Sequence, residues 1–86
     1  MYEGDFVDGK RTGKGRYIWK SGTVYEGDWA DNERTGKGRY VWVNGDVYEG
    51  DFVDNKRHGK GTMRYSSGKI ERGYWENDIF KRKSLF

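Results

Sequence analysis

The sequence contains no cysteine and no proline, and it has a single histidine. Without cysteine there is no disulfide framework and no thiolate metal site, and this composition suits a reducing compartment. Without proline, nothing interrupts a continuous ladder of backbone hydrogen bonds. Hydrophobic residues make up only 33% of the 86 residues, which excludes a large apolar core.

No apolar run is long enough to cross a bilayer, and no apolar stretch follows Met1. We therefore expect neither a transmembrane helix nor a secretory signal in these 86 residues. We expect a cytoplasmic protein, either free or attached peripherally to a membrane or the cytoskeleton. The repeating pattern already includes residue 2. We therefore expect the chain to be a piece of a longer protein.

The overall composition is close to that of a disordered chain, with 36% charged residues and a mean hydropathy of −1.19. Aromatic residues reach 17%, however, and they recur at fixed positions, so we predict a folded domain. The net charge of +3 is too small to indicate nucleic acid binding by itself.

The tetrapeptide YEGD begins at Tyr2, Tyr25 and Tyr48, at a constant interval of 23 residues. It opens three similar units, residues 2–24, 25–47 and 48–70, and a partial fourth unit over 71–78 is followed by a basic and apolar tail over 79–86. A fixed period of this length is typical of an array in which each unit packs on its neighbours. We expect residues 1–86 to form one such array.

Within each unit, residue types alternate with a period of two, which is typical of a β-strand. In the first unit Tyr2, Gly4 and Phe6 fall on one side, whereas Glu3 and Asp5 fall on the other. The alternation breaks over residues 8–13 and then resumes, so each unit predicts two short strands. The strands are expected over 71–75 and from the following starting points: Tyr2, Gly13, Tyr25, Gly36, Tyr48 and Gly59.

The dipeptides Ser21-Gly22, Asn44-Gly45 and Ser67-Gly68 lie between the strand patterns. Asn-Gly is a strong hairpin signal, because a type I′ turn needs positive φ at both central residues. The connections are too short for crossover helices, so neighbouring strands must be antiparallel. The sequence therefore predicts an all-β, antiparallel β-meander built from tandem 23-residue hairpin repeats.

The two faces of this meander differ in chemistry. One face collects aromatic side chains interleaved with glycines, which leave room for rings to lie over the backbone. The other face brings Glu26 and Asp28 opposite basic residues of neighbouring strands, with aliphatic side chains between them. Opposite charges paired across strands contribute about 0.2–1 kcal/mol each.

The pattern YEGDF-VDGKRTGKGRYIW-KSG-TV resembles the MORN repeat (membrane occupation and recognition nexus), whose consensus is approximately YEGxWxxGxxHGxGxxxxxxGxxY. The resemblance covers residues 2–70 and continues through Trp75. It implies an elongated, twisted, single-layer antiparallel sheet that bears an aromatic groove. It also implies a binding or scaffolding role, with phospholipid contact, self-association and docking of a helix or peptide. The chain departs from the pattern at Thr12, Thr35 and Met63.

We expect a non-enzymatic scaffold that binds a helix or extended peptide of a protein partner in this groove. A sheet of one layer has no second sheet against which to bury its aromatic face, so the rings pack on one another and leave an apolar surface. Such a surface usually marks an interaction site, and we predict that the rings serve both as core and as site. The predicted groove residues are Tyr17, Trp19, Tyr25, Trp29, Tyr40, Trp42, Tyr48, Phe52, Tyr65 and Trp75.

A peripheral membrane module that binds anionic phospholipids or phosphoinositides is the alternative. Basic residues expected at the loop tips would meet lipid headgroups at about 1 kcal/mol per residue. Acidic residues beside them favour a simple role in solubility, and the alternating Glu and Asp disfavour a nucleic acid partner. The candidate lipid contacts are Lys10, Arg11, Arg34, Lys56 and Arg57.

The ends of the array are expected to mediate self-association, giving a homodimer. The first strand has an open edge and no polar cap. At the far end Tyr74 stands on the polar face, where the second unit has Asp28. We expect it to be covered by a second copy of this end or by the tail. The tail residues available for this are Ile79, Phe80, Leu85 and Phe86.

Nothing in the sequence assembles a reaction centre, so we expect no enzyme activity, no cofactor and no metal. The recurring Gly-Lys-Gly, as in residues 59–61, lacks the spacing and the following helix of a phosphate-binding loop. His58 occupies a position that the other units fill with threonine, which favours a structural role. The acidic pairs recur in every unit opposite basic neighbours, as on a solvated sheet face.

Overall fold

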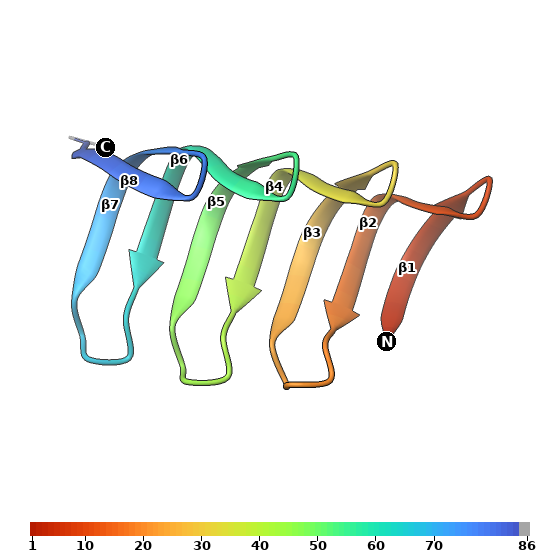
Figure 1. Cartoon of the computed structure of the whole chain (residues 1–86), viewed down its shortest axis with the longest axis horizontal. Helices are drawn as coiled ribbons and strands as arrows, with labels where there is room; N and C mark the ends of the chain where they lie inside the picture. Colours follow the sequence, from red (N-terminus) through yellow and green to blue (C-terminus); the bar gives the residue numbers. More distant parts are fainter. Residues whose placement is uncertain (85–86) are drawn as a thin grey trace.

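The chain folds into a single antiparallel sheet. The computed structural model describes residues 1–84, and the order of the strands in space is their order in the sequence (Figure 1). The predicted all-β meander of hairpin repeats is confirmed. The strands are β1 (Tyr2–Val7), β2 (Lys10–Ile18), β3 (Val24–Ala30), β4 (Glu33–Val41), β5 (Val47–Val53), β6 (Lys56–Arg64), β7 (Ile70–Glu76) and β8 (Ile79–Lys83).

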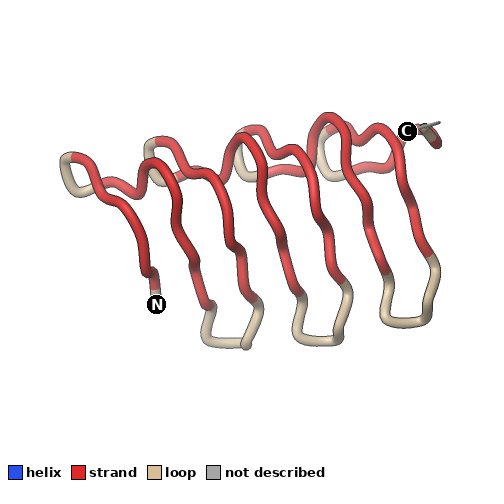
Figure 2. Tube along the Cα trace, turned by 180° about the vertical axis from the view of Figure 1, so that it is seen from behind, coloured by secondary structure: helices blue, strands red, loops and turns tan. Residues whose placement is uncertain are grey.

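The sheet is elongated across its strands, with extents of 40 × 23 × 18 Å. The N-terminus lies at one end of the long axis and the C-terminal strand at the other (Figure 1). Figure 2 shows the wide loops along one edge of the sheet and the tight turns along the other. Each 23-residue unit therefore advances the array by two strands.

The sheet bends within each unit, close to a pair of glycines. Gly27 of β3 pairs with Gly38 of β4, but the next pair is Trp29 with Arg34. Residues 35–37 of β4 thus face a single residue of β3, which makes a β-bulge. The same shift occurs between β1 and β2 and between β5 and β6.

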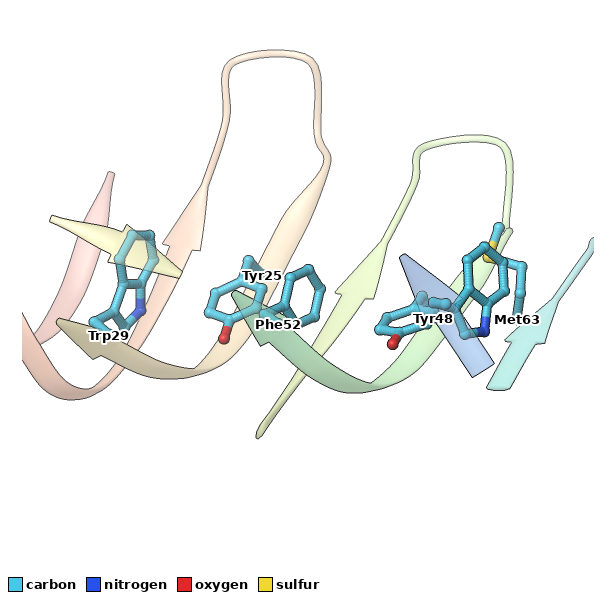
Figure 3. Close-up of a cluster of buried hydrophobic side chains, with 6 residues drawn as sticks. Tyr25, Trp29, Tyr48, Phe52 and Met63 are labelled. Atoms are coloured by element: carbon cyan, nitrogen blue, oxygen red, sulfur yellow. The ribbon is translucent and has the colours of Figure 1, made fainter. Parts of the chain in front are cut away.

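The aspartate of YEGD holds this bulge in place. The carboxylate of Asp28 accepts a hydrogen bond from the backbone N–H of Lys37 at 2.9 Å. Because bulges bend the strand that contains them, the sheet becomes curved. Figure 3 shows the rings of Tyr25 and Phe52 on the inner side of the curve.

The tight turns lie at other positions than the sequence predicted. Positive φ at both central residues, as in a type I′ turn, occurs at Asp31-Asn32 (47° and 69°) and at Asp54-Asn55 (49° and 69°). At Asn44-Gly45 only the glycine has positive φ, and residues 42–46 form a wider loop. The prediction of a type I′ turn at Asn44-Gly45 is wrong, because Asp and Asn also tolerate the left-handed region and take these turns.

This difference moves the strand boundaries. The strands β2, β4 and β6 begin three residues before the predicted Gly13, Gly36 and Gly59, because the chain reverses earlier. The sequence also gave no prediction for β8. It forms because Asn77-Asp78 makes one more turn with positive φ at both residues, which lets the tail pair with β7.

Candidate functional site

The aromatic face contains two rows of rings that differ in burial. The inner aromatic row consists of Tyr25, Trp29, Tyr48, Phe52 and Trp75, each at most 4% exposed (Figure 3). Its rings meet edge to face, with centroids 5.2 Å apart for Tyr25 and Trp29 and 5.1 Å apart for Tyr25 and Phe52. This arrangement is favourable for aromatic quadrupoles and continues from unit to unit. The inner aromatic row is the core of the array.

Hydrogen bonds satisfy the polar atoms of this row. The hydroxyl of Tyr25 donates to the backbone carbonyl of Asp28 at 2.9 Å, and the indole N–H of Trp29 donates to the carbonyl of Gly15 at 3.1 Å. Burial raises the pKa of Tyr25 and of Tyr48 far above the ordinary value of a tyrosine, because a buried phenolate would lose its hydration. These tyrosines are therefore neutral structural groups.

The outer aromatic row consists of Tyr17, Trp19, Tyr40, Trp42 and Tyr65, and all five are partly exposed. Ring centroids lie 5.5 Å apart for Trp19 and Tyr40 and 4.5 Å apart for Tyr40 and Trp42. These residues come from the ends of β2, β4 and β6 and from the wide loops that follow. The ten residues predicted to line the groove thus divide equally, with the inner aromatic row closed off and the outer aromatic row open to solvent.

One arginine of each full unit lies across the rings on the same face. The guanidinium carbon of Arg34 is 5.2 Å from the ring centroid of Tyr40 and 5.7 Å from that of Trp19. Arg57 lies 4.7 Å from Trp75, and Arg11 lies 4.6 Å from Trp29. A guanidinium at these distances is attracted by the negative face of the ring.

These arginines also connect each unit to the next. The backbone N–H of Arg34 donates to Oδ1 of Asn55 at 2.8 Å, and Nη2 of Arg34 donates to the backbone carbonyl of Asn55 at 2.8 Å. Arg11 makes the same contacts with Asn32, and Arg57 makes them with Asp78. In each case the residue that accepts these hydrogen bonds belongs to the tight turn of the following unit. We call these three contacts the inter-unit clamps.

The arginines therefore do not occupy the loop tips, and that expectation is wrong. Arg11, Arg34 and Arg57 lie inside β2, β4 and β6 and are partly buried. Only Lys10 and Lys56 of the predicted lipid contacts are exposed, at the first positions of their strands. Sequence reasoning missed the clamps, although the signal was present.

The parity of the strand carries that signal. Arg11 lies an even number of residues from Tyr17, which is the spacing of side chains on one face of a strand. The asparagines Asn32 and Asn55 recur at the same position of their units. Only the pairing of neighbouring units brings arginine and asparagine together.

The three clamps differ in charge. Arg57 forms an ion pair with Asp78, with Nε and Oδ1 3.1 Å apart. Arg11 and Arg34 face the neutral amides of Asn32 and Asn55, and neither forms an ion pair with any residue in the range 1–84. Two partly buried guanidinium groups on the aromatic face are therefore not neutralised by a carboxylate of the described chain.

A hollow of about 220 Å³ lies between the second and third clamps. Its walls combine aromatic rings with both guanidinium groups. The residues that line it are Arg34, Tyr40, Trp42, Phe52, Asn55, Arg57 and Asp78.

The opposite face places Glu26 and Asp28 opposite basic residues as predicted, and ion pairs form for Asp28 and for equivalent pairs along the array. Lys14 pairs with Asp28, Lys37 with Asp51, and Arg39 with Glu49 at 3.7 Å. The hydrogen bond from Lys14 is the main cause that lowers the pKa of Asp28. All these side chains are exposed or partly exposed, so each pair stabilises the fold only weakly.

The tail pairs with β7 through β8, but Phe80 packs on Trp75 instead of covering Tyr74 as expected, because consecutive strand residues point to opposite faces. Phe80 of β8 packs against Trp75 with centroids 5.2 Å apart, and the guanidinium carbon of Arg82 lies 4.6 Å from the ring centroid of Tyr74. Ile79 remains 59% exposed. The remaining candidates for this cover, Leu85 and Phe86, lie outside the described residues.

The remaining expectations concern His58, metal ions and membrane-spanning helices. His58 accepts a hydrogen bond from the backbone N–H of Asn77 at 3.4 Å, in line with a structural role. Residues 1–84 contain no group of three or more acidic or histidine side chains placed to hold a metal ion. The same range contains no helix long and apolar enough to cross a membrane.

Comparison with protein families agrees with this geometry. The family model for the MORN repeat matches residues 2–24, 25–47 and 48–70. The chain belongs to the MORN repeat family. MORN repeats generally mediate contacts with proteins or membranes, and they are binding and scaffolding repeats rather than enzymes. A comparison with curated protein sequences finds no match.

Proposed function

We propose that this MORN array is a non-enzymatic scaffold that holds a helix or extended segment of a protein partner on its outer aromatic row. The supporting observation is the split in burial between the two rows. Because the inner aromatic row already supplies the core, the partly exposed rings of Trp19, Tyr40 and Trp42 are available for a partner. Tryptophan and tyrosine are the side chains most often found at the centre of binding surfaces.

The dimensions suit a segment that runs along the array. The long axis measures 40 Å, and a helix of about 20 residues spans roughly 30 Å. A segment in this direction contacts the outer rings of all three full units. Each additional unit then adds contacts of the same kind.

Selection from displayed peptide libraries tests this proposal. One library presents helical peptides and the other extended peptides, and both are selected on the wild-type protein. Binding of the selected peptides should fall at least tenfold in Trp42→Gln, whose ring is only partly buried. A matched control is Val41→Gln, because consecutive strand residues point to opposite faces. Equal binding to wild type and Trp42→Gln, with both folded by circular dichroism, would refute the proposal.

Trp29 is unsuited to this test. It is only 4% exposed, so its replacement creates a cavity in the core and costs about 3–5 kcal/mol. Loss of binding in Trp29→Ala would then report unfolding rather than contact with the partner.

One observation favours contact with an anionic membrane as a second candidate. At two tight turns an exposed valine pairs across strands with an exposed lysine, Val7 with Lys10 and Val53 with Lys56. Such apolar and cationic pairs suit a headgroup interface. Sedimentation with phosphatidylserine vesicles should then depend on the lysines and be lost in Lys10→Glu/Lys56→Glu. Unchanged sedimentation in that variant would exclude these two tight turns as the site of membrane contact.

We also propose that the ends of the array associate in a homodimer. The edge of β1 supports this, because Phe6 is 58% exposed there. Light scattering checks the mass in the micromolar range. A monomer mass throughout would exclude the homodimer, and a dimer abolished by Tyr74→Asp would place it at the C-terminal end.

A further inference from the structure

We infer that the partner segment is a helix with two carboxylates seven residues apart, one for Arg11 and one for Arg34. This inference rests on the proposed function, because it specifies the segment that the outer aromatic row receives. Three features of the groove carry it: the charge of the clamps, their spacing, and the difference between the third clamp and the first two.

The first feature is uncompensated charge. Two of the five N–H groups of the Arg34 guanidinium donate to Asn55, through Nε and Nη2. The other N–H groups have no carboxylate acceptor within residues 1–84. A partly buried guanidinium that lies within 6 Å of ring centroids and already donates to Asn55 is held in place, so a carboxylate gains a strong, directed hydrogen bond at little entropic cost.

The second feature is spacing. Equivalent residues of consecutive units are two strands apart, which corresponds to roughly 9.6 Å. Seven residues of an α-helix rise about 10.5 Å, and they return the side chain to within about 20° of the same face. Side chains on one face of an extended peptide repeat at about 6.6 or 13 Å, which fits the clamps less well. The spacing therefore favours a helix over an extended segment.

The third feature fixes the register. Arg57 is neutralised by Asp78, so the third clamp offers a neutral site where the first two offer positive ones. A helix with a third carboxylate at the next heptad position would face Asp78. The bound helix is therefore expected to carry a neutral or basic residue there, which sets its direction along the array.

The hollow between Arg34 and Arg57 fits the same helix. It lies between the second and third clamps, and Tyr40, Trp42 and Phe52 contribute to its walls. A side chain three or four residues beyond the second carboxylate reaches this level of the array. We expect a large apolar residue at that position of the partner.

Synthetic helical peptides of about 21 residues test the inference. The probe carries two glutamates seven residues apart, one leucine between the second glutamate and the third heptad position, and a fluorescent label for anisotropy. Comparison peptides have glutamine in place of both glutamates, or glutamates five residues apart. We expect the probe to bind at least tenfold more tightly than either comparison peptide, and this difference should shrink at high salt.

The protein itself supplies matched variants. Asp78 shows that aspartate fits the clamp with the same hydrogen bonds that Asn55 makes, so Asn32→Asp and Asn55→Asp should fold. The double variant neutralises Arg11 and Arg34 and should lose the preference for glutamate over glutamine. The reverse change, Asp78→Asn, frees Arg57 and should increase the affinity for a peptide with a third glutamate by about tenfold.

The outcomes separate this inference from the proposed function. Equal affinity for the glutamate and glutamine peptides would overturn the inference. If Trp42→Gln still abolished binding of those peptides, the outer aromatic row would remain the site, and the proposed function would stand. An unchanged glutamate preference in Asn32→Asp/Asn55→Asp would also overturn it, since the acid would then be recognised elsewhere. Loss of the preference in that variant, with an unchanged melting temperature, would support it.

Discussion

The phenol ring of Tyr25 lies directly over Gly38, so close that a Cβ atom on Gly38 would come within 2.4 Å of its Cε1 atom. Because the ring is completely buried, it has no room to move aside. We expect Gly38→Ala to lower the free energy of unfolding by about 3 kcal/mol, at the upper end for overpacked cores. Chemical denaturation measures this change.

Gly9→Asn is the control for that experiment. A Cβ atom on Gly9 would meet no other atom within 4 Å, and its φ of 76° resembles the 69° of Asn32 and Asn55 at the same turn position. This substitution should change stability by less than about 0.5 kcal/mol. If Gly38→Ala were equally mild, the ring would not be held against the glycine.

The same pentapeptide, YEGDF, should give two different energies in two places. Phe52 packs on Tyr25 of the preceding unit and is 3% exposed, whereas Phe6 packs on Tyr2 of its own unit and is 58% exposed. We expect Phe52→Ala to cost about 3–5 kcal/mol and Phe6→Ala less than about 1 kcal/mol. Equal costs from urea titrations would show that contact between units does not provide the core.

Stability should fall in alkaline solution. Burial raises the pKa of Tyr25 and Tyr48 in the folded state, so their contribution is fully present below the pKa of an unfolded tyrosine, about 10, and is lost as the pH rises above it. The free energy of unfolding should decrease there by up to about 1.4 kcal/mol per pH unit for each tyrosine. In Tyr48→Phe the free energy of unfolding should decrease less steeply with pH, because one buried tyrosine no longer contributes. An unchanged slope would contradict the role given to Tyr48.

The inter-unit clamp should stabilise the fold through the side chain of asparagine. In Asn55→Gly the left-handed backbone is retained, but the hydrogen bonds from Arg34 to Oδ1 are lost. We expect a loss of about 1–2 kcal/mol, measured by thermal melting. Asn55→Asp retains the acceptor, as Asp78 does in the next unit, and should be close to wild type in stability. A neutral effect of Asn55→Gly would show that the clamp is dispensable.

Much of the architecture followed from the sequence alone. The 23-residue period, the alternation of residue types and the short connections predict antiparallel hairpins, because each is a local property of strands and turns. The room that Gly38 leaves for the ring of Tyr25 was likewise predictable, since glycine next to a large ring on one face leaves space for it. The cross-strand pair of Lys14 and Asp28 followed from the same register.

Other features depend on how one unit packs against the next. Trp29 and Trp42 are both tryptophans on one face, and nothing local separates them. The first is buried because rings of the preceding unit cover it, whereas the second lies at the start of a wide loop. The arginine clamps likewise need a residue of the following unit, 21 positions away.

The positions of the tight turns were also decided by tertiary structure. The sequence by itself determined that each unit reverses twice, because two alternating segments are separated by turn-forming residues. It did not decide which reversal is tight, since Asn-Gly and Asp-Asn both tolerate positive φ. Hydrogen bonds between units favour Asp31-Asn32 and Asp54-Asn55 for the tight turns, because there the asparagine side chain accepts a hydrogen bond from an arginine of the preceding unit.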